Sequence, residues 1–219
     1  MHSISSTNKL YQDFIGIEEG AHRMLVRFYE AKAEEIARLD FDTYFEILVD
    51  YTNALFEIGA YTKHIEQVEK ILQLSIEHNI HFYKGEDIFC KSLFQKAAAH
   101  YNMLEFDRAE YVLKELIKIT PTNELAIRFL KKCLYQSRPA YIKYARAISI
   151  ACFLGAALVT AIDLIFIHPF ATNDTHFWEY LRLDICGFGI LLLGGSFLYH
   201  RLRVNFQINH FVQKVKAKS

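Results

Sequence analysis

The spacing of hydrophobic residues divides the chain into two regions. Before residue 138, apolar positions recur every three or four residues, which is the spacing of amphipathic helices. From Tyr144 to His168 the apolar residues are almost continuous, and only Arg146 and Asp163 are charged. The pattern predicts an all-α protein in which antiparallel helical hairpins are followed by a pair of apolar helices.

The first region is expected to hold an N-terminal segment, residues 1–17, and a helical domain, residues 18–137. Thr43 with Glu46, and Asp107 with Glu110, have the spacing of capping boxes at helix starts. Gly59 is typical of a helix end, and the short connections imply antiparallel neighbours. Helices are predicted over residues 18–38, 41–58, 62–78, 86–104, 107–119 and 123–136.

Two apolar stretches of the second region have the character of membrane spans. Residues 144–168 exceed the roughly 20 helical residues that cross a hydrocarbon core. Residues 183–200 are shorter, and only 14 residues separate the two stretches, so the second returns through the bilayer or runs along its face. We expect a return, and so predict a transmembrane hairpin of helices 144–168 and 183–200. An extracytoplasmic loop, residues 169–182, would join them, and a basic tail, residues 201–219, would follow.

Charges around the hairpin predict its orientation. The loop carries only Arg182, against Asp174 and Glu179, whereas both outer flanks are basic without acidic residues. By the positive-inside rule, both termini are expected in the cytoplasm of an integral protein of the cell (plasma or inner) membrane. The first residues lack the apolar core of a signal peptide, so the hairpin is expected to direct targeting. The basic flanks consist of Arg138, Lys143 and Arg146 before the first span and Arg201, Arg203, Lys214, Lys216 and Lys218 after the second.

Composition narrows the function classes. The chain has 25 Lys and Arg against 25 Asp and Glu, so its overall charge gives no reason to expect nucleic acid as a partner. Residues 1–137 alone carry 16 basic and 21 acidic side chains, which makes the helical domain acidic. The four cysteines show no clustered spacing, so reduced thiols are expected in place of disulfides or a zinc site.

The chain lacks the common catalytic and cofactor motifs. It contains no G-x-S-x-G, no phosphate-binding loop, no G-x-G-x-x-G before a helix and no H-E-x-x-H. His78 and His81, with Glu86 and Cys90 nearby, have metal-binding chemistry, but they are spread over a helix end and a connection. We therefore predict neither an enzyme nor a bound metal or cofactor.

The segment from Cys90 to Asn123, CKSLFQKAAAHYNMLEFDRAEYVLKELIKITPTN, resembles a tetratricopeptide repeat (TPR), a 34-residue pair of helices. Ala97 and Ala109 fall at its small positions, which let the two helices approach closely, and Pro121 falls at its proline position. Residues 45–78 fit the same template less well. The alternative is an ordinary helical bundle that contains one repeat-like hairpin.

The resemblance implies a function in protein interaction. TPR-like arrays bind peptides or extended segments of other proteins in a groove lined by the first helix of each pair. Aromatic, amide and basic groups at those positions would hold an acidic or C-terminal segment. Solvated or core-packed side chains are the alternative for each of them. The implied groove residues are Asn53, Phe56, Lys91, Phe94, Tyr101, Asn102, Arg128, Lys132 and Tyr135.

The apolar helices carry two further features. Asp163 is an ionisable group within a span, which by default indicates function, although a hydrogen bond to Thr160 or a position near the outer surface would also explain it. Small residues favour close helix packing, within the hairpin or in a homo-oligomer. The small residues concerned are Ala147, Ala151, Gly155, Gly194 and Gly195. The basic tail is expected either to lie as an amphipathic helix on the anionic leaflet or to continue the second span and pack under the helical domain.

Two functions follow from these features. The first is a membrane-anchored adaptor or scaffold, whose TPR-like domain holds another protein at the cytoplasmic face of the bilayer. The second is a membrane effector, whose soluble domain senses a ligand or partner and whose hairpin oligomerises to perturb the bilayer.

Overall fold

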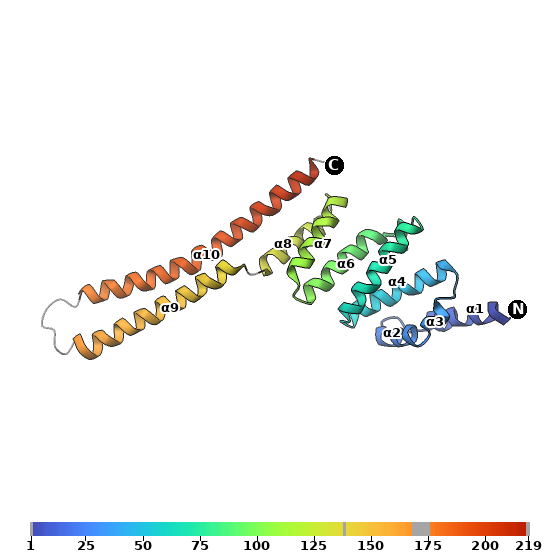
Figure 1. Cartoon of the computed structure of the whole chain (residues 1–219), viewed down its shortest axis with the longest axis horizontal. Helices are drawn as coiled ribbons and strands as arrows, with labels where there is room; N and C mark the ends of the chain where they lie inside the picture. Colours follow the sequence, from blue (N-terminus) through green and yellow to red (C-terminus); the bar gives the residue numbers. More distant parts are fainter. Residues whose placement is uncertain (1, 138, 168–175, 218–219) are drawn as a thin grey trace. The chain divides into compact units, whose positions relative to one another are not determined.

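The computed structural model describes residues 2–137, 139–167 and 176–217, and these residues form two units. The first unit comprises residues 1–133 and the second residues 134–218. Within the described residues, the only strands are two segments of two residues each, so the prediction of an all-α protein is confirmed (Figure 1).

The first unit is a succession of helices, and each helix between residues 41 and 119 packs against the next one along the chain. His64 of the fifth helix contacts Thr52 and Phe56 of the fourth, and Tyr61 also contacts Phe56, so the contacts converge on the short connection. This convergence is that of an antiparallel pair. The elements are α1 (His2–Ile15), α2 (His22–Ala31), α3 (Ala33–Ile36), α4 (Phe41–Glu57), α5 (Tyr61–Glu77), β1 (Phe82–Tyr83), β2 (Glu86–Asp87), α6 (Ile88–Asn102), α7 (Phe106–Ile119) and α8 (Glu124–Gln136).

Helix starts are set by side-chain caps that differ from the predicted ones. Asp40 caps α4, since its carboxylate accepts the N–H of Thr43 at 3.0 Å, and Asp87 caps α6 in the same way at 2.8 Å. The predicted capping boxes at Thr43 and Asp107 are therefore wrong, because both residues lie inside helices. The helix expected over residues 18–38 is also interrupted, at Lys32, which leaves the helical conformation with φ of −120°.

One core cluster of the first unit is built from α2 to α6. It includes Val26, Phe45, Leu48, Leu55 and Ile71, all of them buried. Burial of such apolar side chains supplies most of the favourable free energy of folding. In α6 and α7, Ala97 and Ala109 are completely buried, as expected for small residues at a close helix approach.

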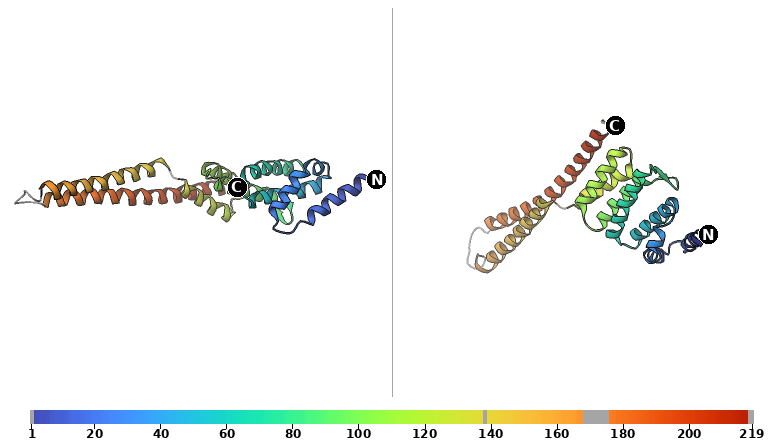
Figure 2. Two further views of the ribbon diagram at one scale, coloured as in Figure 1. Left: turned by 90° about the horizontal axis from the view of Figure 1, so that it is seen from below. Right: turned by 45° about the vertical axis from the view of Figure 1, so that its right-hand side comes forward.

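The second unit is a pair of long helices that lie side by side in both views of Figure 2. They are α9 (Ala140–Ile162), extended by a π-helical turn, η1 (Asp163–Ile167), and α10 (His176–Lys216). Tyr141 of α9 contacts His200 of α10. Cys152, eleven residues further along α9, lies at Gly189, which is eleven residues earlier in α10. The pair is therefore antiparallel.

Both helices of the second unit are long and apolar enough to span a membrane. Of the predicted loop, residues 169–175 lie outside the described residues, whereas residues 176–182 belong to α10, so the helix begins earlier than predicted. The tail also lacks the boundary placed at residue 201, because α10 continues without a break to Lys216. The structure shows the continuous helix of the second alternative, whereas packing under the helical domain stays a prediction.

Candidate functional site

The first helices of the predicted groove are joined side by side. Gln95 of α6 donates a hydrogen bond to the side-chain oxygen of Asn53 of α4 at 2.9 Å. Aromatic contacts from Phe129 to Phe94 and Tyr101 join α8 to α6. We call the surface that α4, α6 and α8 share the first-helix face.

Three predicted groove residues meet on α6 and α8. The ring of Phe129 lies 5.4 Å from that of Phe94 and 5.3 Å from that of Tyr101, centroid to centroid. The ammonium of Lys132 lies 4.9 Å from the centroid of the Tyr101 ring, within range of a cation–π interaction. These four residues form an aromatic and basic surface at one end of the first-helix face. Phe129 was not predicted, although it directly follows Arg128 in a helix already assigned to the groove.

The other predicted groove residues are not brought together in this way. Phe56 packs on Tyr61 and His64 in the α4–α5 interface. Lys91 pairs with Glu86, and Arg128 pairs with Glu124 at 2.9 Å. Asn102 is exposed, and Tyr135 belongs to the second unit, where its hydroxyl donates to Asn205 at 2.9 Å.

A cavity of about 510 Å³ opens at the other end of the first-helix face. Asn53 lines it, which makes it continuous with that face. Two basic groups, Lys84 and His22, also line it, so carboxylates outnumber basic groups on its wall and the cavity favours a cationic ligand group. The carboxylates that line it are Glu18, Glu19, Glu46 and Asp50.

The charges inside this cavity are coupled through Lys84. Its ammonium lies 3.1 Å from Glu46 and 3.4 Å from Asp50. Burial is the largest single influence and lowers the pKa of Lys84, but the bond to Glu46 together with Tyr83 and the charge of Asp50 outweighs it, so the net pKa is raised and the ammonium stays charged. The hydrogen bond from Tyr11, 2.7 Å long, lowers the pKa of Glu46, whereas burial raises that of Asp50. This group was not predicted from the sequence, where its one signal is the i, i+4 spacing of the two carboxylates on α4.

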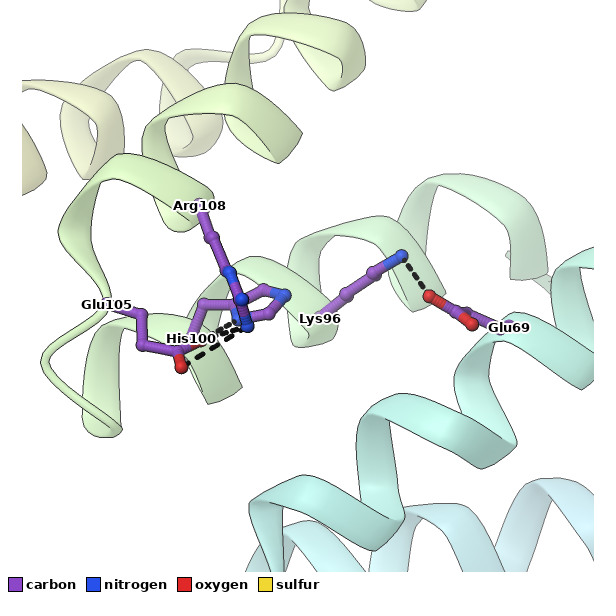
Figure 3. Close-up of polar contacts among 5 residues, drawn as sticks. All are labelled: Glu69, Lys96, His100, Glu105 and Arg108. Carbon is purple, nitrogen blue, oxygen red and sulfur yellow. Dashed lines mark hydrogen bonds and ion pairs between the residues drawn. The ribbon is translucent and has the colours of Figure 1, made fainter.

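A second cleft, of about 480 Å³, lies between α5 and α7. Figure 3 shows polar contacts at this cleft: Lys96 pairs with Glu69 at 2.9 Å, and Glu105, beside the cleft, pairs with His100 at 2.7 Å and with Arg108 at 3.2 Å. The bond to His100 lowers the pKa of Glu105. Because Glu105 lies in the α6–α7 connection, its contacts with His100 and Arg108 stabilise that turn.

Small residues do line the interface of α9 with α10, but not the ones predicted. Ser149 and Ala156, seven residues apart on α9, are buried. On α10, a Cβ added at Gly189 would lie 3.4 Å from the Cβ of Cys152, which marks the close approach. The predicted packing residues differ: Ala147 and Ala151 are exposed, and a Cβ at Gly155, Gly194 or Gly195 would meet nothing within 4 Å.

This close approach predicts a disulfide. In a Gly189→Cys variant, the two Cβ atoms would lie near the 3.5–4.5 Å range typical of disulfides. Mild oxidation is expected to join the introduced thiol to Cys152 within one chain, seen as protection of both thiols from a maleimide reagent. Gly194→Cys is the matched control, and it should stay reactive. Equal reactivity of the two variants would show that the helices do not pair in this register.

Asp163 lies at the junction of α9 and the π-helical turn, with its side chain partly buried. Within the described part of the chain, its Oδ1 is enclosed and has no hydrogen-bond partner. Thr160 does not supply one, because its hydroxyl donates to the carbonyl of Ala156 at 2.8 Å. The predicted bond between Thr160 and Asp163 is therefore absent from the described part of the chain.

Comparison of the chain with protein-family models, with curated proteins and with solved structures finds no match. The resemblance to TPR therefore stays a prediction, supported by helix order and by the buried alanines alone. Among the described residues, no group of three or more His, Cys, Asp or Glu is placed to hold a metal ion.

Proposed function

We propose that this chain is a membrane-anchored adaptor or scaffold, in which α9 and α10 span a bilayer and the first unit binds a segment of another protein. In this proposal both termini lie in the cytoplasm, because the basic residues lie before the first apolar helix and after the second. The bilayer would be the cell membrane.

The observation that carries the membrane half of the proposal is the exposure of apolar side chains on the helix pair. The two helices bury only the faces that they turn to each other. An apolar surface of this extent needs a cover, and lipid chains provide one that requires no hydrogen bonds. The exposed side chains include Ile150, Leu154, Leu158, Ile190, Leu191 and Phe197.

The binding half of the proposal rests on the two ends of the first-helix face. One end offers the acidic cavity, and the other offers the aromatic rings with Lys132. A partner segment that complements both would place a cationic group near Asp50 and apolar or acidic groups near Phe94 and Lys132. Aromatic and basic side chains of this kind supply much of the binding energy at protein interfaces.

Site-specific photo-crosslinking in intact cells tests this binding face. A crosslinking amino acid at Asn102 or Asn53 is expected to capture the same partner protein, identified by mass spectrometry. The control position is Tyr111, which is exposed but lines the cleft between α5 and α7. The proposal fails if Tyr111 captures that partner equally well, or if neither asparagine position captures any.

The membrane effector is the second candidate, and two observations favour it. Ala147 and Ala151 are exposed on α9, where a second subunit could pack closely, and an oxygen of Asp163 lacks a partner within the described residues. An effector should cause ion leak when overexpressed, and Ala151→Leu should abolish the leak. An adaptor should cause none, so absence of leak at high expression would eliminate the effector.

A further inference from the structure

The end of the helix pair at which α9 begins carries a polar and aromatic cluster of Tyr141, His200 and Arg203. The Tyr141 hydroxyl lies 2.9 Å from Nδ1 of His200. The guanidinium carbon of Arg203 lies 5.9 Å from the centroid of the Tyr141 ring. The ring therefore holds the guanidinium in place while leaving it exposed. We call this group the Tyr141 cluster.

No acidic residue of α9 or α10 lies near this end of the helix pair. Residues 125–162 and 185–219 contain no Asp or Glu. Arg203 and three further exposed cations, Lys143, Arg146 and Arg201, form no ion pair among the described residues. Unpaired like charges repel one another, so an external anion bound here would stabilise the pair.

Two further groups at the Tyr141 cluster could hydrogen-bond an anion. His200 is only 8% exposed, yet its Nε2 has no hydrogen-bond partner within the described residues. α9 begins after Pro139 without a side-chain cap, and the N–H of Ile142 donates to the Pro139 carbonyl, so the N–H groups of Ala140 and Tyr141 remain available at the positive end of the helix dipole. Helix N-termini of this kind favour phosphate.

We propose that the Tyr141 cluster binds the phosphate of an anionic phospholipid headgroup. This proposal rests on the proposed membrane anchoring. The cluster would lie at the depth of the headgroups, because Tyr141 is about 4.5 Å along the helix from Tyr144, where the apolar stretch begins. The planar guanidinium of Arg203 can donate two hydrogen bonds to one phosphate.

A lipid fits this position better than soluble phosphate. Ile148 lies two helical turns beyond Tyr141 towards the apolar part of α9, on the same side of the helix, and is exposed. An acyl chain attached to the bound headgroup would cover that surface, which a free phosphate would leave bare.

Native mass spectrometry of the delipidated full chain in detergent tests this site. Phosphatidylglycerol is expected to bind at least tenfold more tightly than phosphatidylcholine, since an anionic headgroup gains attraction from several cations. Arg203→Gln should weaken phosphatidylglycerol binding about fivefold, because one basic residue near an anionic membrane surface contributes about that factor to the affinity. Tyr141→Phe, which keeps the ring beneath Arg203, should weaken it less. Lys214→Gln removes the same charge about 16 Å further along α10 and should leave the affinity unchanged.

Three outcomes would overturn the headgroup site. The first is equal affinity for the two lipids, and the second is equal losses in Arg203→Gln and Lys214→Gln. The third is displacement of phosphatidylglycerol by an equal concentration of inorganic phosphate, which would identify a soluble ligand. Carbonate extraction of membranes separates this failure from that of the proposed function. A chain that resists extraction but shows no lipid preference overturns the site alone, whereas a chain released by carbonate overturns the anchoring and the site together.

Discussion

Replacing both Leu154 and Leu158 with arginine is expected to release most of the chain from membranes. Both side chains lie near the middle of the apolar part of α9 and are 66% and 61% exposed, so in the proposed bilayer they face lipid. An arginine at the centre of a membrane helix is disfavoured by about 3 kcal/mol relative to leucine, and two by about 6 kcal/mol. The measurement is the fraction that resists carbonate extraction from membranes of expressing cells.

The first unit supplies a matched control for this double substitution. Leu104 and Leu125 are 72% and 67% exposed there, so Leu104→Arg with Leu125→Arg adds the same two charges away from the helix pair. This variant should remain in the membrane fraction. Membrane anchoring by α9 would be refuted if the Leu154 and Leu158 double variant resisted extraction as fully as the control.

The stability of the first unit is expected to decline below pH 6.5 because of His64. Its side chain is 0% exposed between α4 and α5, and its Nδ1 lies 2.8 Å from the carbonyl of Thr52. Burial lowers its pKa below the ordinary 6.5, so below that pH the unfolded chain binds a proton that the folded chain does not. The stabilisation is complete above pH 6.5. It falls by about 1.4 kcal/mol per pH unit until the folded-state pKa is reached.

Pulse proteolysis of the full chain in urea, between pH 5.5 and 7.5, measures this free energy of unfolding. His64→Gln removes the titrating ring and should flatten the pH dependence, whatever its effect on stability at neutral pH. His81→Gln removes an exposed imidazole and should leave the slope as it is. An unchanged slope in His64→Gln would show that another group controls the pH response.

The helices of this chain were predictable because their apolar spacing is regular, whereas details set by a single backbone conformation were not. The interruption at Lys32 has no glycine or proline to indicate it. The β1–β2 hairpin turns through Lys84 and Gly85, both with positive φ, as two-residue hairpin turns require. Only Gly85 signalled this turn. Asp40 was overlooked as a cap because Thr43 and Glu46 match the capping-box spacing by chance.

The candidate sites were predictable one helix at a time. Phe94 and Tyr101 share a face of α6 because they lie seven residues apart, and that spacing is visible in the sequence. Their contact with Phe129 depends on how far α8 is displaced along α6, which no local pattern records. The same limit applies to the glycines of α10. Gly189 meets Cys152 while Gly194 meets nothing, because the register of two helices decides which glycine lies in the interface.

The uninterrupted course of α10 has a mechanical consequence. Its 41 residues form a rod about 60 Å long, of which the last 16 residues, about 24 Å, extend beyond the apolar part. A tilt of the apolar part by about 10° would therefore carry the last turn sideways by about 4 Å. In the proposed bilayer, α10 would thus act as a lever, which converts a small tilt of its apolar part into a larger displacement of its basic end.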